Sequence, residues 1–149
     1  MSDLIEQFCA SLDRDVLVGL VGVGTFGTTL RELAEARGCQ LLLCDPPKSF
    51  AQAEELNDGF FALWGNGMGG CELTGQGLDT YLPLSSLARA QVIAIQVPLT
   101  DASPNSTRNL ITPEFLTRCR QDARIFCFSD PAVIAPEVQG DPRIRYPLH

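Results

Sequence analysis

The first 45 residues alternate between helical apolar stripes and short continuous apolar runs. Residues 3–13 and 26–37 carry apolar side chains three or four positions apart, which predicts two amphipathic helices. Residues 16–21 and 40–44 are uninterrupted apolar runs, which are typical of strands buried on both faces of a parallel sheet. Gly38 provides the stop of the second helix. A strand, a helix and a strand in about 30 residues predict a right-handed parallel crossover.

The same alternation returns in the second half of the chain. Residues 84–90 predict a short helix and residues 92–97 a third buried strand. A further helix begins at Thr112 to Glu114, because threonine caps a helix and the following proline fits its first position. Residues 124–128 and 143–146 predict a fourth and a fifth strand. Strands alternating with helices indicate an α/β fold, with a mainly parallel sheet between two layers of helices.

The segment between residues 53 and 80 does not follow this alternation. Residues 59–64 are aromatic and could form a strand, but residues 65–77 are rich in glycine, which is typical of turns. We therefore treat this segment as an unassigned Gly-rich insertion. Its aromatic residues are more typical of packing than of a nucleic-acid platform, because no Lys or Arg lies beside them.

Length and charge limit the function classes. The 149 residues are 45% hydrophobic, which predicts one domain spanning residues 1–149. Eleven basic and eighteen acidic residues give a net charge of −7, which disfavours nucleic acid and anionic membranes as partners. The sequence shows neither a signal peptide nor an apolar run of about 18 residues, so we expect a cytoplasmic protein outside the membrane.

The cysteines and the single histidine do not predict a metal site. No two cysteines form a C-x-x-C pair, and His149 is the only histidine, so a histidine-based zinc cluster is excluded and we expect no metal. Reduced thiols that pack as small hydrophobic groups are the simplest interpretation. The six cysteines are Cys9, Cys39, Cys44, Cys71, Cys119 and Cys127.

A glycine motif follows the first predicted strand and opens the second helix. Gly22, Gly24 and Gly27 form a G-x-G-x-x-G run, and Asp45 follows the next strand 18 residues beyond Gly27. This is the context of a Rossmann-type dinucleotide-binding turn. The first glycine permits the tight turn, the second leaves room for a pyrophosphate, and the third allows close packing of helix and strand.

The motif predicts NAD as the cofactor. The helix that begins at Thr25 and Phe26 would offer its N-terminal N–H groups and positive dipole to the phosphates. Asp45 would accept hydrogen bonds from the ribose hydroxyls and repel a 2′-phosphate, which favours NAD over NADP. The alternative is that the glycines serve only a tight turn and Asp45 only caps the next element.

Three motifs in fixed order resemble the NAD-binding domain of the D-isomer-specific 2-hydroxyacid dehydrogenases. They are residues 18–24, residues 43–48, and residues 97–99 with Thr107 and residues 110–111 downstream. Within that family the Cys-Asp-Pro-Pro-Lys stretch is most similar to the erythronate-4-phosphate dehydrogenases. The resemblance implies a doubly wound Rossmann-type sheet, an NAD cofactor, and a cofactor-pocket edge formed by Val97 and Pro98.

The chain also departs from the family pattern. Gln96 stands where the family has a histidine, which alters the edge of the cofactor pocket. Where the family has an arginine that holds the substrate carboxylate, this chain has Asp130 followed by Pro131. Only Glu137 and His149 could act as the family's proton-transfer pair, and a terminal histidine is poorly held. The catalytic residues are therefore left unassigned.

Most of the family's substrate domain is also missing, since only residues 1–15 precede the first strand. The chain is either a fragment or a free-standing descendant of such a dehydrogenase, and a homodimer partner or a separate substrate domain would have to complete the cleft. Any activity would be NAD-dependent oxidation of the CH–OH group of a 2-hydroxy acid, and we expect the isolated chain to be inactive. The alternative is a non-enzymatic interaction protein that keeps the fold without the cofactor.

Overall fold

The computed structural model describes residues 2–22, 24–45, 82–101 and 106–147. The described strands form one five-stranded sheet in the order β2-β1-β3-β4-β5, and every pair of neighbouring strands is parallel. The strands are β1 (Leu17–Val21), β2 (Gln40–Cys44), β3 (Val92–Ile95), β4 (Arg124–Cys127) and β5 (Ile144–Arg145). The helices are α1 (Ser2–Ser11), α2 (Thr25–Ala36) and α6 (Pro113–Arg118), with 3-10 turns η1 (Leu84–Arg89), η2 (Pro131–Val133) and η3 (Pro136–Val138).

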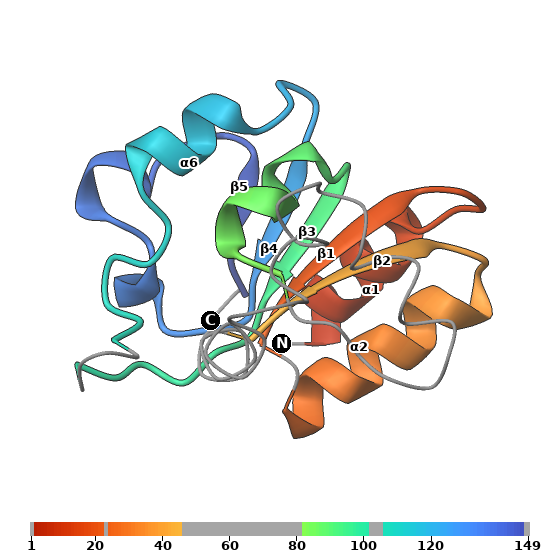
Figure 1. Ribbon diagram of the computed structural model, residues 1–149. Coiled ribbons are helices and arrows are strands. Elements are labelled where there is room, and N and C mark those ends of the chain that lie inside the picture. The colour runs from red at the N-terminus through yellow and green to blue at the C-terminus, as the bar shows by residue number, and fades with distance from the viewer. Residues whose placement is uncertain (1, 23, 46–81, 102–105, 148–149) are drawn as a thin grey trace, which may run out of the picture.

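Two apolar clusters cover the two faces of the sheet, so the fold has three layers. On one face α1 and α2 pack through Leu4, Phe8 and Leu30 onto alternate strand residues. On the other face η1 and α6 pack through Leu87 and Phe115 onto the intervening strand residues. Figure 1 shows these helices on opposite sides of the sheet. The expected α/β fold with a doubly wound, Rossmann-type parallel sheet is therefore confirmed.

The strand order creates a switch point at the centre of the sheet. From β1 the chain moves outward to β2, then returns to pair β3 on the other side of β1. The loops that leave the C-terminal ends of β1 and β3 therefore diverge to opposite faces of the sheet. In open parallel sheets, ligands bind in the crevice between such loops.

Local details differ from the sequence expectations at three places. The short helix expected at residues 84–90 is the 3-10 turn η1. Strand β3 ends at Ile95, two residues early, and β5 spans only two residues. The early end of β3 is followed by Pro98, which lacks the N–H that a strand ladder needs. The Gly-rich segment 53–80, Cys71 and His149 lie outside the described residues.

The described cysteines behave as the sequence indicates. Cys44, Cys119 and Cys127 are buried in the core, and none of the described cysteines forms a disulfide. Burial raises the pKa of Cys119 and of Cys127 to about 11, so both thiols stay protonated near neutral pH. Within the described ranges no cluster of His, Cys, Asp and Glu could hold a metal ion, and no helix is long and apolar enough to cross a membrane.

Candidate functional site

Gly22 forms the tight turn that leaves β1. Its φ of +98° lies in the region that favours glycine, and its N–H donates to the carbonyl oxygen of Cys44, 2.7 Å away. A Cβ at this position would lie 2.6 Å from the backbone oxygen of Gln96. The turn is therefore pressed between β2 and β3, and only glycine fits there.

Gly27 lets the first turn of α2 approach the same place. It is buried, and a Cβ built on it would collide with the carbonyl oxygen of Gly22 and lie 3.0 Å from Nε2 of Gln96. A side chain would thus push α2 away from the end of β1. The role expected for the third glycine, close packing of helix and strand, agrees with this contact.

Gly24 is the N-cap of α2 and has a different environment. It is exposed, and a Cβ built on it would have no atom of the described residues within 4 Å. No described side chain caps this end of α2, and Thr25 beside it is exposed as well. The N-terminus of α2 therefore opens to solvent, with space over Gly24 for an approaching anion.

Asp45 lies beside the glycine turn. The register pairs Val21 with Cys44, so Gly22 and Asp45 follow directly at the C-terminal ends of neighbouring strands. Asp45 is half-buried. The structure thus brings the carboxylate and the three glycines to one edge of the sheet, as the spacing predicts.

Phe26 has a packing role in the structure. Its ring contacts the ring of Phe128 at a centroid distance of 5.2 Å, which ties the start of α2 to the end of β4. Phe128 in turn packs on Phe8 of α1, at 6.2 Å. The aromatic rings therefore fix where the N-terminus of α2 stands relative to the sheet.

Gln96 has a role that sequence reasoning missed. Its side-chain Nε2 donates to the carbonyl oxygen of Gly22, 74 residues away in the sequence. This hydrogen bond fixes the glycine turn to the end of β3. Its Oε1 atom is buried and has no hydrogen-bond partner in the part of the chain that the structure describes. The one signal in the sequence was that Gln96 stands where the family has a histidine, and it did not indicate this hydrogen bond.

Val97 and Pro98, expected at the pocket edge, follow Gln96 at the end of β3. Val97 is buried, and its N–H donates to Oγ of Ser129 over 2.8 Å, which joins the ends of β3 and β4. Pro98 is exposed, and its carbonyl oxygen accepts a 2.6 Å hydrogen bond from Thr107 Oγ1. The structure therefore places both residues at the same edge as the glycine turn.

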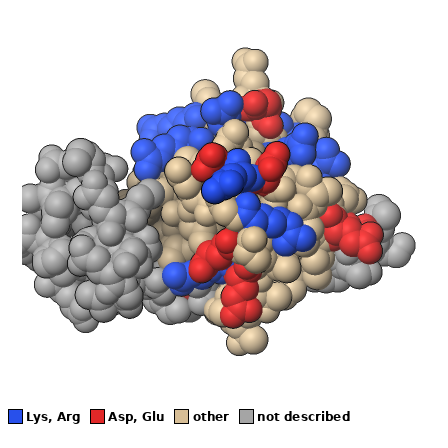
Figure 2. Space-filling view, turned by 90° about the vertical axis from the view of Figure 1, so that its right-hand side faces the viewer, with Lys and Arg blue, Asp and Glu red and all other residues tan. Residues whose placement is uncertain are grey.

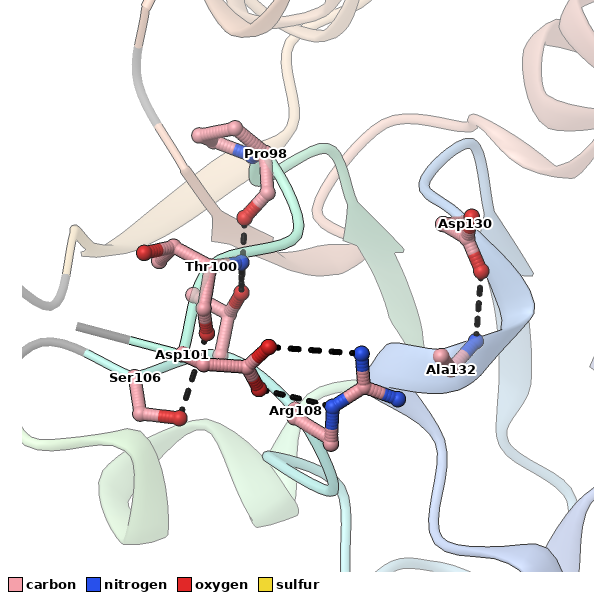
Figure 3. A network of polar contacts seen from close by, with 8 residues as sticks. Pro98, Thr100, Asp101, Ser106, Arg108, Asp130 and Ala132 are labelled. Carbon is pink, nitrogen blue, oxygen red and sulfur yellow. Dashed lines mark hydrogen bonds and ion pairs between the residues drawn. The ribbon is translucent and has the colours of Figure 1, made fainter.

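The loop after Pro98 is closed by polar contacts, shown in Figure 3. Thr107 is buried, and its Oγ1 accepts from the N–H of Thr100 at 2.8 Å. Arg108 Nε and Asp101 Oδ1 lie 2.7 Å apart in an exposed ion pair. Hydrogen bonding to Arg108 lowers the pKa of Asp101, and the same bond raises the pKa of Arg108, with a smaller contribution from the charge of Asp130.

Arg108, from the loop after β3, lies near the turn that follows β4. Asp130 follows β4 and caps η2, where its side chain accepts from the N–H of Ala132 at 2.9 Å. Figure 3 shows Arg108 between Asp101 and this turn. Its charge is already paired with Asp101, so this part of the edge is not a ready anion site.

Sequence comparison finds erythronate-4-phosphate dehydrogenases among the curated proteins similar to this chain. The chain is 34% identical over 107 residues to the erythronate-4-phosphate dehydrogenase of Porphyromonas gingivalis, a match that covers 71% of this chain and 22% of that protein. The chain thus spans about a fifth of the length of the curated relatives it matches. No protein-family model matches the chain.

Solved structures show the same fold. A phosphoglycerate oxidoreductase from Vibrio cholerae superposes with a TM-score of 0.59 and 19% identity, over 98% of this chain and 44% of that one. An NAD-complexed D-isomer specific 2-hydroxyacid dehydrogenase from Lactobacillus delbrueckii gives a TM-score of 0.57 at 16% identity, over 89% and 35%. The resemblance to the D-isomer-specific 2-hydroxyacid dehydrogenases is thereby confirmed, and over 71% of its length this chain is a relative of the erythronate-4-phosphate dehydrogenases.

Proposed function

We propose that this chain is an NAD(H)-binding unit whose site is the C-terminal edge of the sheet at the start of α2. The observation that carries the proposal is the environment of Gly24: the N-cap of α2 is exposed, and within the described part of the chain no side chain caps it and no atom fills the space over its Cα. Backbone N–H groups and the helix dipole at such an end favour a phosphate group. The residues present therefore fit a pyrophosphate.

Each residue of the edge has a distinct part in this proposal. The backbone from Gly24 to Gly27 holds the pyrophosphate, Asp45 accepts hydrogen bonds from the adenosine ribose, and Val97 with Pro98 borders the remainder of the dinucleotide. Gln96 keeps the turn in its binding shape through its bond to Gly22. When bound, the nicotinamide supplies a two-electron hydride acceptor or donor, and the chain supplies position and orientation.

We further propose that the unit serves an oxidoreductase of the 2-hydroxyacid dehydrogenase kind. The support is the 34% identity to an erythronate-4-phosphate dehydrogenase. Because the match covers only 22% of that protein, the substrate-binding part has to come from another domain or subunit. The competing possibility, an interaction protein without cofactor, makes the opposite prediction in the titration that follows.

Calorimetric titration of the full chain is expected to show that NAD(H) binds more tightly than NADP(H). A 2′-phosphate would face the Asp45 carboxylate at close range. Replacing Asp45 with asparagine should weaken NAD binding about 10- to 100-fold, because one charged hydrogen-bond partner is worth about 1.5–3 kcal/mol. The same replacement should also reduce the difference in affinity between NAD(H) and NADP(H).

Asp122→Asn is the matched control, since Asp122 precedes β4 at the opposite edge and pairs with Arg120 at 2.9 Å. It should bind NAD like the unmodified chain. If neither cofactor binds at about millimolar concentration, the module is not a nucleotide site and the interaction-protein alternative takes its place.

The isolated chain should not reduce NAD with D-2-hydroxy acids or erythronate 4-phosphate. The edge offers Asp130 and a paired Arg108 where a carboxylate needs a free cation, and Glu137 is exposed on η3. Positioning and proton transfer each supply several orders of magnitude in rate. The measurement is absorbance of the reduced nicotinamide at stoichiometric chain concentration. Turnover that disappears on removal of His149 would contradict this expectation.

A further inference from the structure

The negative net charge of the chain is not evenly distributed. Figure 2 shows basic side chains gathered over the upper part of one side, with acidic side chains between and below them. Four of the described arginines have a carboxylate oxygen within 3 Å: Arg31, Arg108, Arg120 and Arg143 pair with Glu35, Asp101, Asp122 and Asp141. Arg124 and Arg145 differ from these, because no ion pair joins either to a described carboxylate.

These two arginines line a pocket of about 250 Å³ between α1 and the strands β4 and β5. Its walls are formed by Gln7, Ala10, Ser11, Arg124, Phe126 and Arg145. Arg124 is the first residue of β4, so the pocket reaches the N-terminal end of that strand. The proposed nucleotide site lies at the C-terminal edge, so the two places are separate.

The sheet register places both guanidinium groups on the same face. Phe126 pairs with Arg145 across the parallel strands, and Arg124 precedes Phe126 by two positions. All three side chains therefore project from the face of the sheet that α1 covers. Gln7 and Ser11 are four positions apart on one face of α1, directly opposite. The fold therefore brings these four polar side chains together from three elements, α1, β4 and β5.

Hydrogen bonds to other described residues use few of the N–H donors of these two arginines. Arg124 Nη1 donates to Ser11 Oγ at 3.2 Å, and Arg145 Nη1 donates to Gln7 Oε1 at 3.3 Å. Both acceptors are neutral, and each guanidinium has five N–H donors. Asp122 interacts electrostatically with Arg124, but its carboxylate is hydrogen-bonded to Arg120. Among the residues that the structure describes, the two guanidinium groups therefore have no carboxylate paired with them.

We propose that this pocket is an oxyanion site that binds inorganic phosphate or the phosphate group of a small ester. Two guanidinium groups offer parallel N–H donors to several oxygens of one phosphate, an arrangement that also neutralises both charges. The Gln7 side-chain amide can add a donor, whereas the Ser11 hydroxyl already donates to the Gln7 carbonyl oxygen at 3.0 Å. The apolar floor at Phe126 leaves room for a small organic group beside the phosphate.

The test is a titration of the full chain with sodium phosphate, followed by NMR of the amides and arginine Nε–H groups, with sodium chloride at equal ionic strength as reference. Phosphate should shift signals of α1, β4 and β5 with a Kd of about 1 mM or lower. Arg124→Gln and Arg145→Gln should each weaken binding about tenfold. Glycerol 3-phosphate and citrate, titrated in parallel, separate a phosphate-ester site from a general carboxylate site.

Arg118→Gln is the matched control, because Arg118 is exposed on α6, on the other face of the sheet, and its replacement removes the same charge. It should leave phosphate binding unchanged. Equal loss in Arg118→Gln, or shifts no larger with phosphate than with chloride at about 10 mM, would overturn the proposal. Arg145→Lys keeps the positive charge and should retain part of the affinity for phosphate. It should also bind NAD as the unmodified chain does, which would show that the variant is folded.

Discussion

Replacing Gly24 with valine is expected to lower NAD affinity at least about 100-fold while the chain stays folded. The backbone of Gly24, with φ −86° and ψ −154°, is one that valine adopts readily, and a Cβ there meets no atom of the described residues within 4 Å. The added methyl groups would fill the space over the N-terminus of α2 that we assign to the pyrophosphate. Stability should change by only about 1 kcal/mol, the cost of a poorer N-cap residue.

Calorimetry with NAD and a thermal melt followed by circular dichroism measure the two effects separately. Gly140→Val is the matched control, since Gly140 is also exposed and a Cβ built on it also meets no described atom within 4 Å. It should bind NAD normally. If Gly24→Val bound NAD normally, the proposal that this turn binds the phosphates would be wrong, even though the domain has a Rossmann-type fold.

The sequence was sufficient for those features that arise from burial and from chain-local geometry. Strands buried on both faces cannot alternate polar and apolar residues, so β1 and β3 appear as continuous apolar runs. The glycine spacing was likewise informative, because a turn between a strand and a helix is a local structure. The α/β fold, the parallel sheet and the grouping of Asp45 with the glycines follow from these two signals.

The contacts that refine the site could not be predicted, because they join distant parts of the chain. The bond from Gln96 to Gly22 spans 74 residues, and that from Val97 to Ser129 spans 32. Both depend on β3 lying between β1 and β4, which the apolar pattern alone does not determine. Arg108 and Asp130 lie near each other for the same reason: β3 and β4 are neighbours, so the loop after β3 lies beside the turn after β4.

Replacing Gly22 with alanine should destabilise the fold by about 3 kcal/mol, a large share of a typical total of about 5–15 kcal/mol. Two costs add here. A φ of +98° strains an L-residue, and the new Cβ would lie 2.6 Å from the Gln96 backbone oxygen and 2.9 Å from a Val97 methyl carbon. This close contact could be relieved only if β1 and β3 moved apart, because the Gln96 oxygen belongs to the backbone and cannot rotate away as a side chain could.

Gly38→Ala separates the two costs, and urea unfolding of both variants measures them. Gly38 also has a positive φ, +77°, but its nearest neighbour would be the flexible side chain of Arg14 at 3.4 Å. It should therefore lose only about 1 kcal/mol, the cost of the backbone conformation alone. Equal losses at Gly22 and Gly38 would mean that the turn can move away from β3, and that Gln96 does not hold it in place. A larger loss at Gly22 would measure how firmly β3 fixes the shape of the proposed nucleotide site.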